Sequence, residues 1–188
     1  MDKNIESYVK IYNAIDKDLC KSSIEQLDEE QNWKKHSFYD SKHNTSSARS
    51  GDKELDVFSE EIGNKKILSD LTWKSILNYV ESLNFSWYSG WNGFSSIRFN
   101  RYDKDQTMAI HCDHIHSLFD GNRKGVPILS IVGLLNDDYT GGEFIMFEDK
   151  EIKLSAGDIM IFPSNFLYPH KVEPVKEGKR YSFVSWVF

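Results

Sequence analysis

The segment HCDHIH, from His111 to His116, contains three histidines and an aspartate in six residues. Imidazole and carboxylate groups are common ligands of transition metals, so metal binding is the first chemistry to consider. A β-strand places residues i and i+2 on the same face, so His111 and Asp113 are expected to point together, whereas Cys112 points away. A third ligand must come from elsewhere, and the other histidines of the chain are His36, His43, His114, His116 and His170.

His170 lies in a later predicted strand, PHKVEPV. Together with His111 and Asp113 it would place two histidines and one carboxylate on one side of a β scaffold. That set is the facial triad that suits non-haem Fe(II) and leaves coordination positions open for substrate and dioxygen. Arg180 follows in the next predicted strand, after a Glu-Gly-Lys turn, and adds a cation to the same region.

A rival metal motif is His114-x-His116, with Asp120 four residues further on, which faintly resembles the metal motifs of cupins. The second motif expected of a cupin is not evident in the sequence. We therefore expect this segment to lie in a loop after the first metal strand, where Arg123 and Lys124 would join it at the substrate entrance.

The remaining candidates have structural interpretations. His36 and His43 stand in polar surroundings and are predicted to be surface residues. Cys112 is predicted to be a packed thiol. Trp186, in the last predicted strand, is interpreted as a core tryptophan rather than as a residue of the substrate cleft.

Two polar segments are predicted to be loops, Ser41 to Glu54 and residues 114–126, and the first of them is expected to be mobile. Specificity usually depends on such loops, which a rigid scaffold positions. Whether either loop closes over a substrate as a lid is left open by the sequence.

The first half of the chain has mixed α and β patterns. Tyr8 to Ile15 is a candidate strand, and Asp16 is a candidate N-cap for a helix that runs to about Leu27. Ser69 or Asp70 would cap a second helix, whose apolar residues follow helical spacing. Those residues are Trp73, Ile76, Leu77, Val80 and Leu83.

From Phe94 onward, short apolar or alternating runs recur between turn signals, and many short strands at this spacing favour a jelly roll. We therefore predict a mainly β fold, a double-stranded β-helix (jelly roll) with supporting N-terminal helices. One domain is expected over residues 1–188, with an α/β support region at 1–93 and the jelly-roll catalytic core at 94–188. The runs are FSSIRFNRY, QTMAIHCD, PILSIVGLLN, EFIMF, DIMIF, PHKVEPV and RYSFVSWVF.

Composition narrows the class of protein. A net charge of −6 and a pI of about 5.5 argue against a general nucleic-acid binder, which usually has a basic face. The N-terminus has no apolar core of a secretory signal, and no run of about 18 apolar residues occurs, so no membrane segment is expected. Two cysteines make no disulfide framework. A cytoplasmic location is the expectation.

The order of motifs from about Ile97 to Phe188 resembles the catalytic jelly roll of the Fe(II)/2-oxoglutarate-dependent dioxygenase superfamily, and specifically its prolyl 4-hydroxylase-like branch. That order is more specific than any single motif, and the match covers about half of the chain. The motifs are Arg101-Tyr102, His111-x-Asp113, Leu135-Asn136, Gly141-Gly142-Glu143, Gly157-Asp158, His170 and Arg180.

The resemblance implies a role for each site residue. It implies Fe(II) as the metal and 2-oxoglutarate as the co-substrate, with ascorbate as a candidate requirement. The C5 carboxylate of 2-oxoglutarate would need a cation, and a guanidinium matches a carboxylate with two parallel hydrogen bonds. The implied metal ligands are His111, Asp113 and His170, and the implied co-substrate residues are Arg180, Ser182 and Tyr102.

Three positions depart from the family pattern. Asp105 stands where the family often has glycine, Met108 where a second aromatic is often found, and Leu134 where some relatives have tyrosine. These departures leave the metal ligands in place. They concern the co-substrate contacts and the peptide specificity.

The function implied by the resemblance is hydroxylation of an unactivated C–H bond, with a prolyl residue in a peptide or protein as the leading substrate and succinate and CO2 as co-products. The alternatives are the same chemistry on a free amino acid or other small molecule, and a non-catalytic jelly roll that binds metal or a partner. Trp186 stands where nucleobase dealkylases usually have a second arginine, which disfavours a nucleobase substrate. Halogenating relatives lack the carboxylate ligand that Asp113 supplies here, so its presence favours a hydroxylase.

Overall fold

The computed structural model of the chain describes residues 4–40, 45–91, 93–113 and 127–188. Its largest element is a seven-stranded sheet whose strands pair antiparallel. In spatial order the strands are β1 (Lys10–Asn13), β12 (Asp158–Pro163), β8 (Leu129–Leu134), β15 (Arg180–Val187), β6 (Arg98–Tyr102), β5 (Asp56–Phe58) and β2 (Lys34–Lys35).

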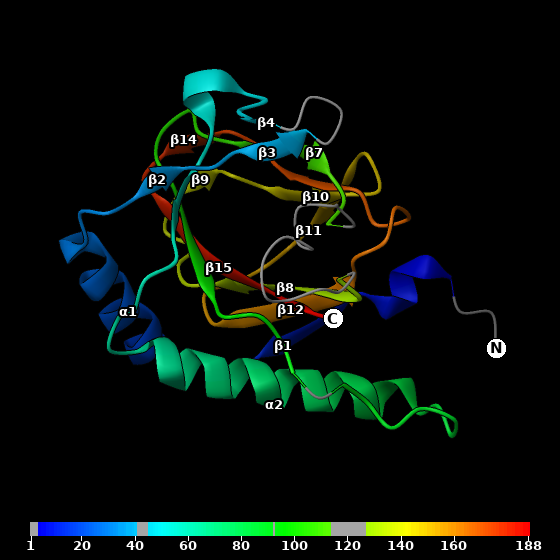
Figure 1. Cartoon of the computed structure of the whole chain (residues 1–188). Coiled ribbons are helices and arrows are strands. Elements are labelled where there is room, and N and C mark those ends of the chain that lie inside the picture. The colour runs from blue at the N-terminus through cyan, green and yellow to red at the C-terminus, as the bar shows by residue number, and fades with distance from the viewer. Residues whose placement is uncertain (1–3, 41–44, 92, 114–126) are drawn as a thin grey trace.

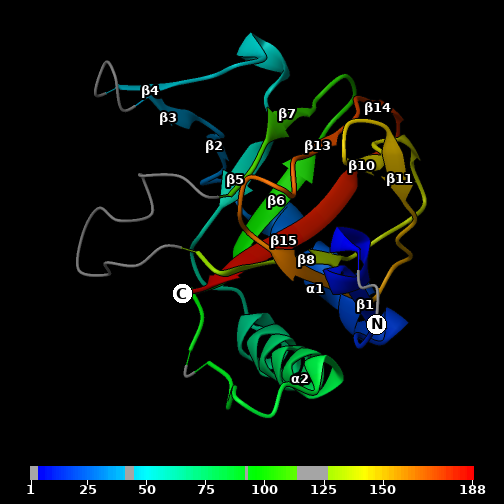
Figure 2. The same cartoon turned by 90° about the vertical axis from the view of Figure 1, so that its right-hand side faces the viewer.

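A four-stranded antiparallel sheet lies over one face of the large sheet (Figures 1 and 2). Buried side chains from both sheets, among them Met146, Met160 and Phe162, fill the space between them. These two facing antiparallel sheets confirm the predicted mainly β jelly roll. The four strands are β11 (Lys150–Ile152), β10 (Phe144–Met146), β13 (His170–Val172) and β7 (Met108–His111), and the short pairs are β9 (Thr140–Gly141) with β14 (Val175–Glu177) and β3 (Phe38–Asp40) with β4 (Thr45–Ser47).

Two helices, α1 (Lys17–Glu29) and α2 (Lys65–Leu83), cover the other face of the large sheet (Figure 1). A second core cluster joins both helices to the sheet, so the predicted support of one sheet by helices is confirmed.

Among the described residues, no helix combines the length and apolar character needed to cross a membrane. The predicted N-cap of the first helix is also confirmed, because Asp16 Oδ1 accepts a hydrogen bond from Leu19 N at 2.8 Å. The first strand begins at Lys10 and not at the predicted Tyr8, which instead belongs to a short 3-10 turn, Ile5–Tyr8.

Helix α2 begins earlier than its sequence pattern predicts. It starts at Lys65 because contacts with other elements hold that end: Asn64 N donates to Gln26 Oε1, and the buried Lys65 ammonium donates to two backbone carbonyls of the preceding loop. The buried face is also rotated from the predicted stripe. Leu77 is 47% exposed, whereas Leu68 and Tyr79 are buried.

Part of the predicted loop Ser41 to Glu54 is ordered, and residues 41–44 lie outside the described residues. The segment contains β4 and a 3-10 turn, Gly51–Lys53. The Glu54 carboxylate is fully buried and accepts hydrogen bonds from the backbone N–H groups of Arg49 and Ser50 at 2.8 and 2.7 Å. The prediction of an irregular loop is therefore wrong where β4 and the 3-10 turn form, and the buried Glu54 carboxylate holds the backbone between them.

Candidate metal centre

Strand pairing brings the three predicted ligands together. His111 ends β7 and pairs directly with His170, the first residue of β13. Asp113 follows two residues after His111, in a bend just beyond the end of β7, although the predicted strand QTMAIHCD included it. Its Oδ1 lies 3.4 Å from His111 Nε2 and its Oδ2 lies 3.8 Å from His170 Nε2. One ligand atom from each residue lies within 4.8 Å of the other two, a spacing that one metal ion can bridge.

Backbone carbonyls orient both imidazole rings. His111 Nδ1 lies 2.8 Å from the carbonyl oxygen of Ala109, and His170 Nδ1 lies 3.1 Å from that of Tyr168. Because a carbonyl oxygen only accepts, each Nδ1 donates to it, and Nε2 is the nitrogen left to face the other ligands. This is the usual arrangement in metal sites, where the second nitrogen of a ligating histidine donates to the protein.

The charge states of Asp113 and His170 are those that metal binding requires. Burial raises the pKa of Asp113, but the adjacent His170 and His111 and the Ser130 hydroxyl outweigh it and hold the pKa below its usual range. Burial lowers the pKa of His170 to about 4, so this imidazole is neutral at pH 7. A carboxylate and neutral imidazoles are the forms that ligate a metal.

Packing holds His170 in one orientation. Phe144 stacks on its ring at 5.4 Å with an interplanar angle of 15°, and Phe162 meets it edge-on at 5.1 Å. On the other side of the pair, Phe38 lies edge-on to His111 at 5.5 Å. Aromatic walls therefore restrict water around the ligands.

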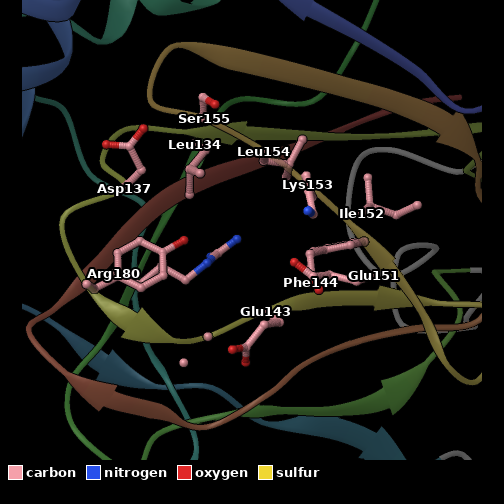
Figure 3. Close-up of a pocket in the computed structure, with 13 residues that line it drawn as sticks. Leu134, Asp137, Glu143, Phe144, Glu151, Ile152, Lys153, Leu154, Ser155 and Arg180 are labelled. Carbon is pink, nitrogen blue, oxygen red and sulfur yellow. The ribbon is translucent and has the colours of Figure 1, made fainter.

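The predicted co-substrate residues also lie together. Arg180 is fully buried and pairs across the sheet with Tyr102, and its Cζ lies 5.0 Å above the Tyr102 ring. Its Nη1 donates to Ser182 Oγ at 2.8 Å. Arg180 also extends into a cavity of about 400 Å³ that Lys153 and Glu143 border (Figure 3).

One cavity connects the three ligands to Arg180, Tyr102 and Ser182. It contains buried polar atoms that have no partner among the described residues, namely Arg180 Nε and Asn100 Oδ1. A buried polar atom without a partner is costly, so a polar ligand is expected in this space. Two imidazoles, one carboxylate and a buried guanidinium fit Fe(II) with a dicarboxylate.

Several residues of the site were not identified from the sequence. Ser130 Oγ donates to Asp113 Oδ2 at 2.5 Å and lies 2.8 Å from Ser164 Oγ. Arg98 lines the same cavity as the ligands. The sequence held a signal for each of them. Ser130 is a serine in the otherwise apolar strand PILSIVGLL, and Arg98 alternates with Tyr102 on one strand face. Trp186 lines this cavity too, so its interpretation as a core residue is wrong.

His36 is not a surface residue, contrary to the sequence prediction. Its side chain is 10% exposed and lies edge-on to Phe38 at 4.6 Å. Burial, with the nearby charge of Arg98, lowers its pKa to about 3 and outweighs Asp113, which raises it. The polar neighbours in sequence face solvent, whereas the His36 side chain lies close to His111 and Asp113. Residues that lie outside the described residues are His43, His114, His116, Asp120, Arg123 and Lys124.

Asp105, where the family often has glycine, has a φ of +67°. The backbone therefore keeps the left-handed conformation that glycine adopts readily. Gly141 and Gly142 also have positive φ, and a Cβ on Gly141 would lie 2.4 Å from the carbonyl oxygen of Pro174. A residue with a side chain at Gly141 would therefore be strained.

Residues 97–188 match the sequence profile of the 2OG-Fe(II) oxygenase superfamily. A PKHD-type hydroxylase from Stenotrophomonas maltophilia is 37% identical over 95 residues, which cover 48% of this chain and 41% of the relative. The match thus spans less than half the length of that curated relative.

Solved structures show the same fold. The viral collagen prolyl hydroxylase of Paramecium bursaria Chlorella virus-1, in complex with 2OG, has a TM-score of 0.67 at 16% identity and covers 96% of this chain and 94% of its own. A prolyl hydroxylase from Trichoplax adhaerens, in complex with a peptide fragment of the hypoxia inducible factor oxygen degradation domain, has a TM-score of 0.70 at 17% identity. That alignment covers 96% of this chain and 83% of the Trichoplax chain.

Proposed function

Because this chain belongs, through residues 97–188, to the 2OG-Fe(II) oxygenase superfamily, we propose that it is an Fe(II)- and 2-oxoglutarate-dependent dioxygenase that hydroxylates a C–H bond. The observation that carries the proposal is the convergence of His111, Asp113 and His170 in one cavity with Arg180. In the described part of the chain, no other group of three such side chains could hold a metal ion.

The chain's own residues would hold the metal and leave part of its coordination sphere open. His111 and His170 would bind it through Nε2, and Asp113 would bind it through a carboxylate oxygen whose position Ser130 fixes. When bound, Fe(II) supplies the site at which dioxygen and 2-oxoglutarate react, with succinate and CO2 as co-products. Three protein ligands on one face leave room for that chemistry.

Arg180 would bind the C5 carboxylate of 2-oxoglutarate. Its guanidinium is buried, so the ion pair would form away from competing water, and Ser182 fixes its direction. Tyr102 lies against Arg180 in the same cavity and would donate its hydroxyl to the co-substrate. The same proposal includes ascorbate, which would serve as the reductant in the assay.

A prolyl residue in a peptide or protein is the substrate that we propose. The structural neighbours described as prolyl hydroxylases support this choice, and one of them is described in complex with a peptide fragment. The relative described as a PKHD-type hydroxylase supports hydroxylation more generally.

The proposal is tested by measuring succinate formation from purified protein with Fe(II), ascorbate, 2-oxoglutarate and a set of proline-containing peptides. We expect turnover in the wild type, and in the control variant Asp149→Ala, which removes an exposed carboxylate. In Asp113→Ala we expect a loss of about 100-fold or more, because a ligand matters more than the supporting groups whose loss costs up to about that much. Unchanged turnover in Asp113→Ala would refute the metal assignment, and succinate without hydroxylated peptide would refute the prolyl substrate.

A further inference from the structure

The cavity face of β6 carries a second arginine toward the metal ligands. Arg98, Asn100 and Tyr102 alternate along this strand, and all three line the cavity. Tyr102 pairs with Arg180 on β15. Since a strand rises about 3.3 Å per residue, roughly 13 Å of backbone separates position 98 from position 102. Arg98 therefore occupies a different part of the cavity from Arg180, the cation that is predicted to bind 2-oxoglutarate.

The part of the cavity that Arg98 occupies is the one beside the metal ligands. Trp186 pairs with Ser130 on β8, and Ser130 donates its hydrogen bond to Asp113. The guanidinium Cζ of Arg98 lies 5.2 Å above the Trp186 ring. Arg98 and Trp186 thus stand together near Asp113, whereas Arg180 lies at the other end of the strand.

Both of these side chains present an unused hydrogen-bond donor. Arg98 Nε and Trp186 Nε1 are buried, and neither has a partner among the described residues. Both nitrogens can only donate. Leaving a buried donor without an acceptor is unfavourable, so this pair is suited to a ligand that supplies acceptors.

The charge at this place favours an anion as that ligand. Burial lowers the pKa of the Arg98 guanidinium, and Asp113 is the first of the groups that oppose this effect. Arginine stays protonated in proteins, so the positive charge remains. Once Asp113 serves as a metal ligand, its negative charge is shared with the metal and no longer balances Arg98 alone. A carboxylate would supply both the charge and the two acceptors.

We propose that Arg98 and the indole N–H of Trp186 bind a carboxylate of the substrate, next to the carbon that is hydroxylated. The inference rests on the proposed function, because it concerns the substrate of the same site. The carboxylate has two sources: the main-chain carboxylate of a free or C-terminal residue, or the side chain of an acidic residue within a peptide.

Two matched pairs of probes separate these sources. N-acetyl-L-proline and N-acetyl-L-prolinamide differ only in the main-chain carboxylate, and a blocked tripeptide with glutamate before proline differs from its glutamine counterpart only in a side-chain charge. For each probe, succinate formation gives kcat/KM. The rise in melting temperature of the anaerobic protein with Fe(II) and 2-oxoglutarate gives binding without turnover.

The variants are Arg98→Gln and Trp186→Phe, with Arg101→Gln as the control. Arg101 lies on the same strand but pairs with Asp56 at 3.3 Å on the other face. We expect wild type and Arg101→Gln to prefer the acidic member of one pair by roughly 10- to 100-fold, the range for a hydrogen bond between charged groups. Arg98→Gln should reduce that preference to near one, and Trp186→Phe should reduce it partly.

The outcomes distinguish the inference from the proposed function. If 2-oxoglutarate raises the wild-type melting temperature but neither acidic probe is preferred, the inference is overturned and the proposed function stands. A preference that survives in Arg98→Gln also overturns it. If 2-oxoglutarate gives neither a melting-temperature rise nor succinate, the proposed function itself fails.

Discussion

The hydrogen bond from Ser130 holds one carboxylate oxygen of Asp113 in place at the candidate metal site, and Ser130→Ala removes it. Ser130 Oγ lies 2.5 Å from Asp113 Oδ2 and 2.8 Å from Ser164 Oγ. A carboxylate only accepts, so the Ser130 proton points to Asp113 and Ser164 must donate to Ser130. The variant therefore leaves a buried carboxylate oxygen with one donor fewer.

The expected consequence is a loss of metal affinity of about one to two orders of magnitude. A hydrogen bond to a charged group contributes roughly 1.5–3 kcal/mol, and about 1.4 kcal/mol corresponds to a factor of ten. The same range, about 10- to 100-fold, is typical when a group that hydrogen-bonds a metal ligand is removed. The pKa of Asp113 should also rise, because the Ser130 hydroxyl is one of the groups that lower it.

Calorimetric titration with Fe(II) under anaerobic conditions measures this change. Ser185→Ala is the matched control, because Ser185 is fully buried on the other face of β15 and donates to the Ser95 carbonyl at 2.7 Å. That variant should bind Fe(II) as the wild type does, and Ser164→Ala should lose less affinity than Ser130→Ala. A dissociation constant for Ser130→Ala within about twofold of the wild type would refute the argument from the hydrogen-bond range.

Three further predictions follow from single contacts. Arg180→Met should abolish the rise in melting temperature that 2-oxoglutarate gives the Fe(II)-loaded protein, because it removes the buried guanidinium; an undiminished rise in a thermal-shift assay would contradict its role. Tyr168 donates to the Ile5 carbonyl at 2.8 Å, and burial raises its pKa to about 12. The unfolded chain therefore loses this proton first, at a pH of about 10, so the stabilisation is complete below pH 10 and is lost as the pH rises through 12. Urea unfolding should show that loss in the wild type and a smaller one in Tyr168→Phe. Gly141→Ala should lower the free energy of unfolding by about 1–3 kcal/mol, since φ is +73° and the added Cβ would meet the Pro174 carbonyl; an unchanged urea midpoint would contradict this.

The common direction of His111 and Asp113 could be predicted because it depends on local geometry. His111 and Asp113 are two residues apart, so they point together although Asp113 lies just beyond the end of β7. The partner His170 was recognised through the order of motifs, which reflects strand pairing that is common to the fold. Jelly-roll strands were likewise visible as short apolar runs between turns.

The supporting residues could not be predicted because they depend on which strands are neighbours. Ser130 reaches Asp113, and Arg98 reaches the cavity, only because β8 and β6 flank β15. The start of α2 was missed for a similar reason, since its first turn is held by Gln26 of the other helix. His36 was misplaced because polar sequence neighbours say little about the direction of a side chain between two short strands.

A crystal structure of the anaerobic protein with Fe(II) and 2-oxoglutarate tests the central claim most directly. We predict one ion bound by His111 Nε2, His170 Nε2 and the Asp113 carboxylate, with the distal carboxylate of 2-oxoglutarate on Arg180. An ion held by other residues, or a 2-oxoglutarate molecule bound away from Arg180, would contradict it.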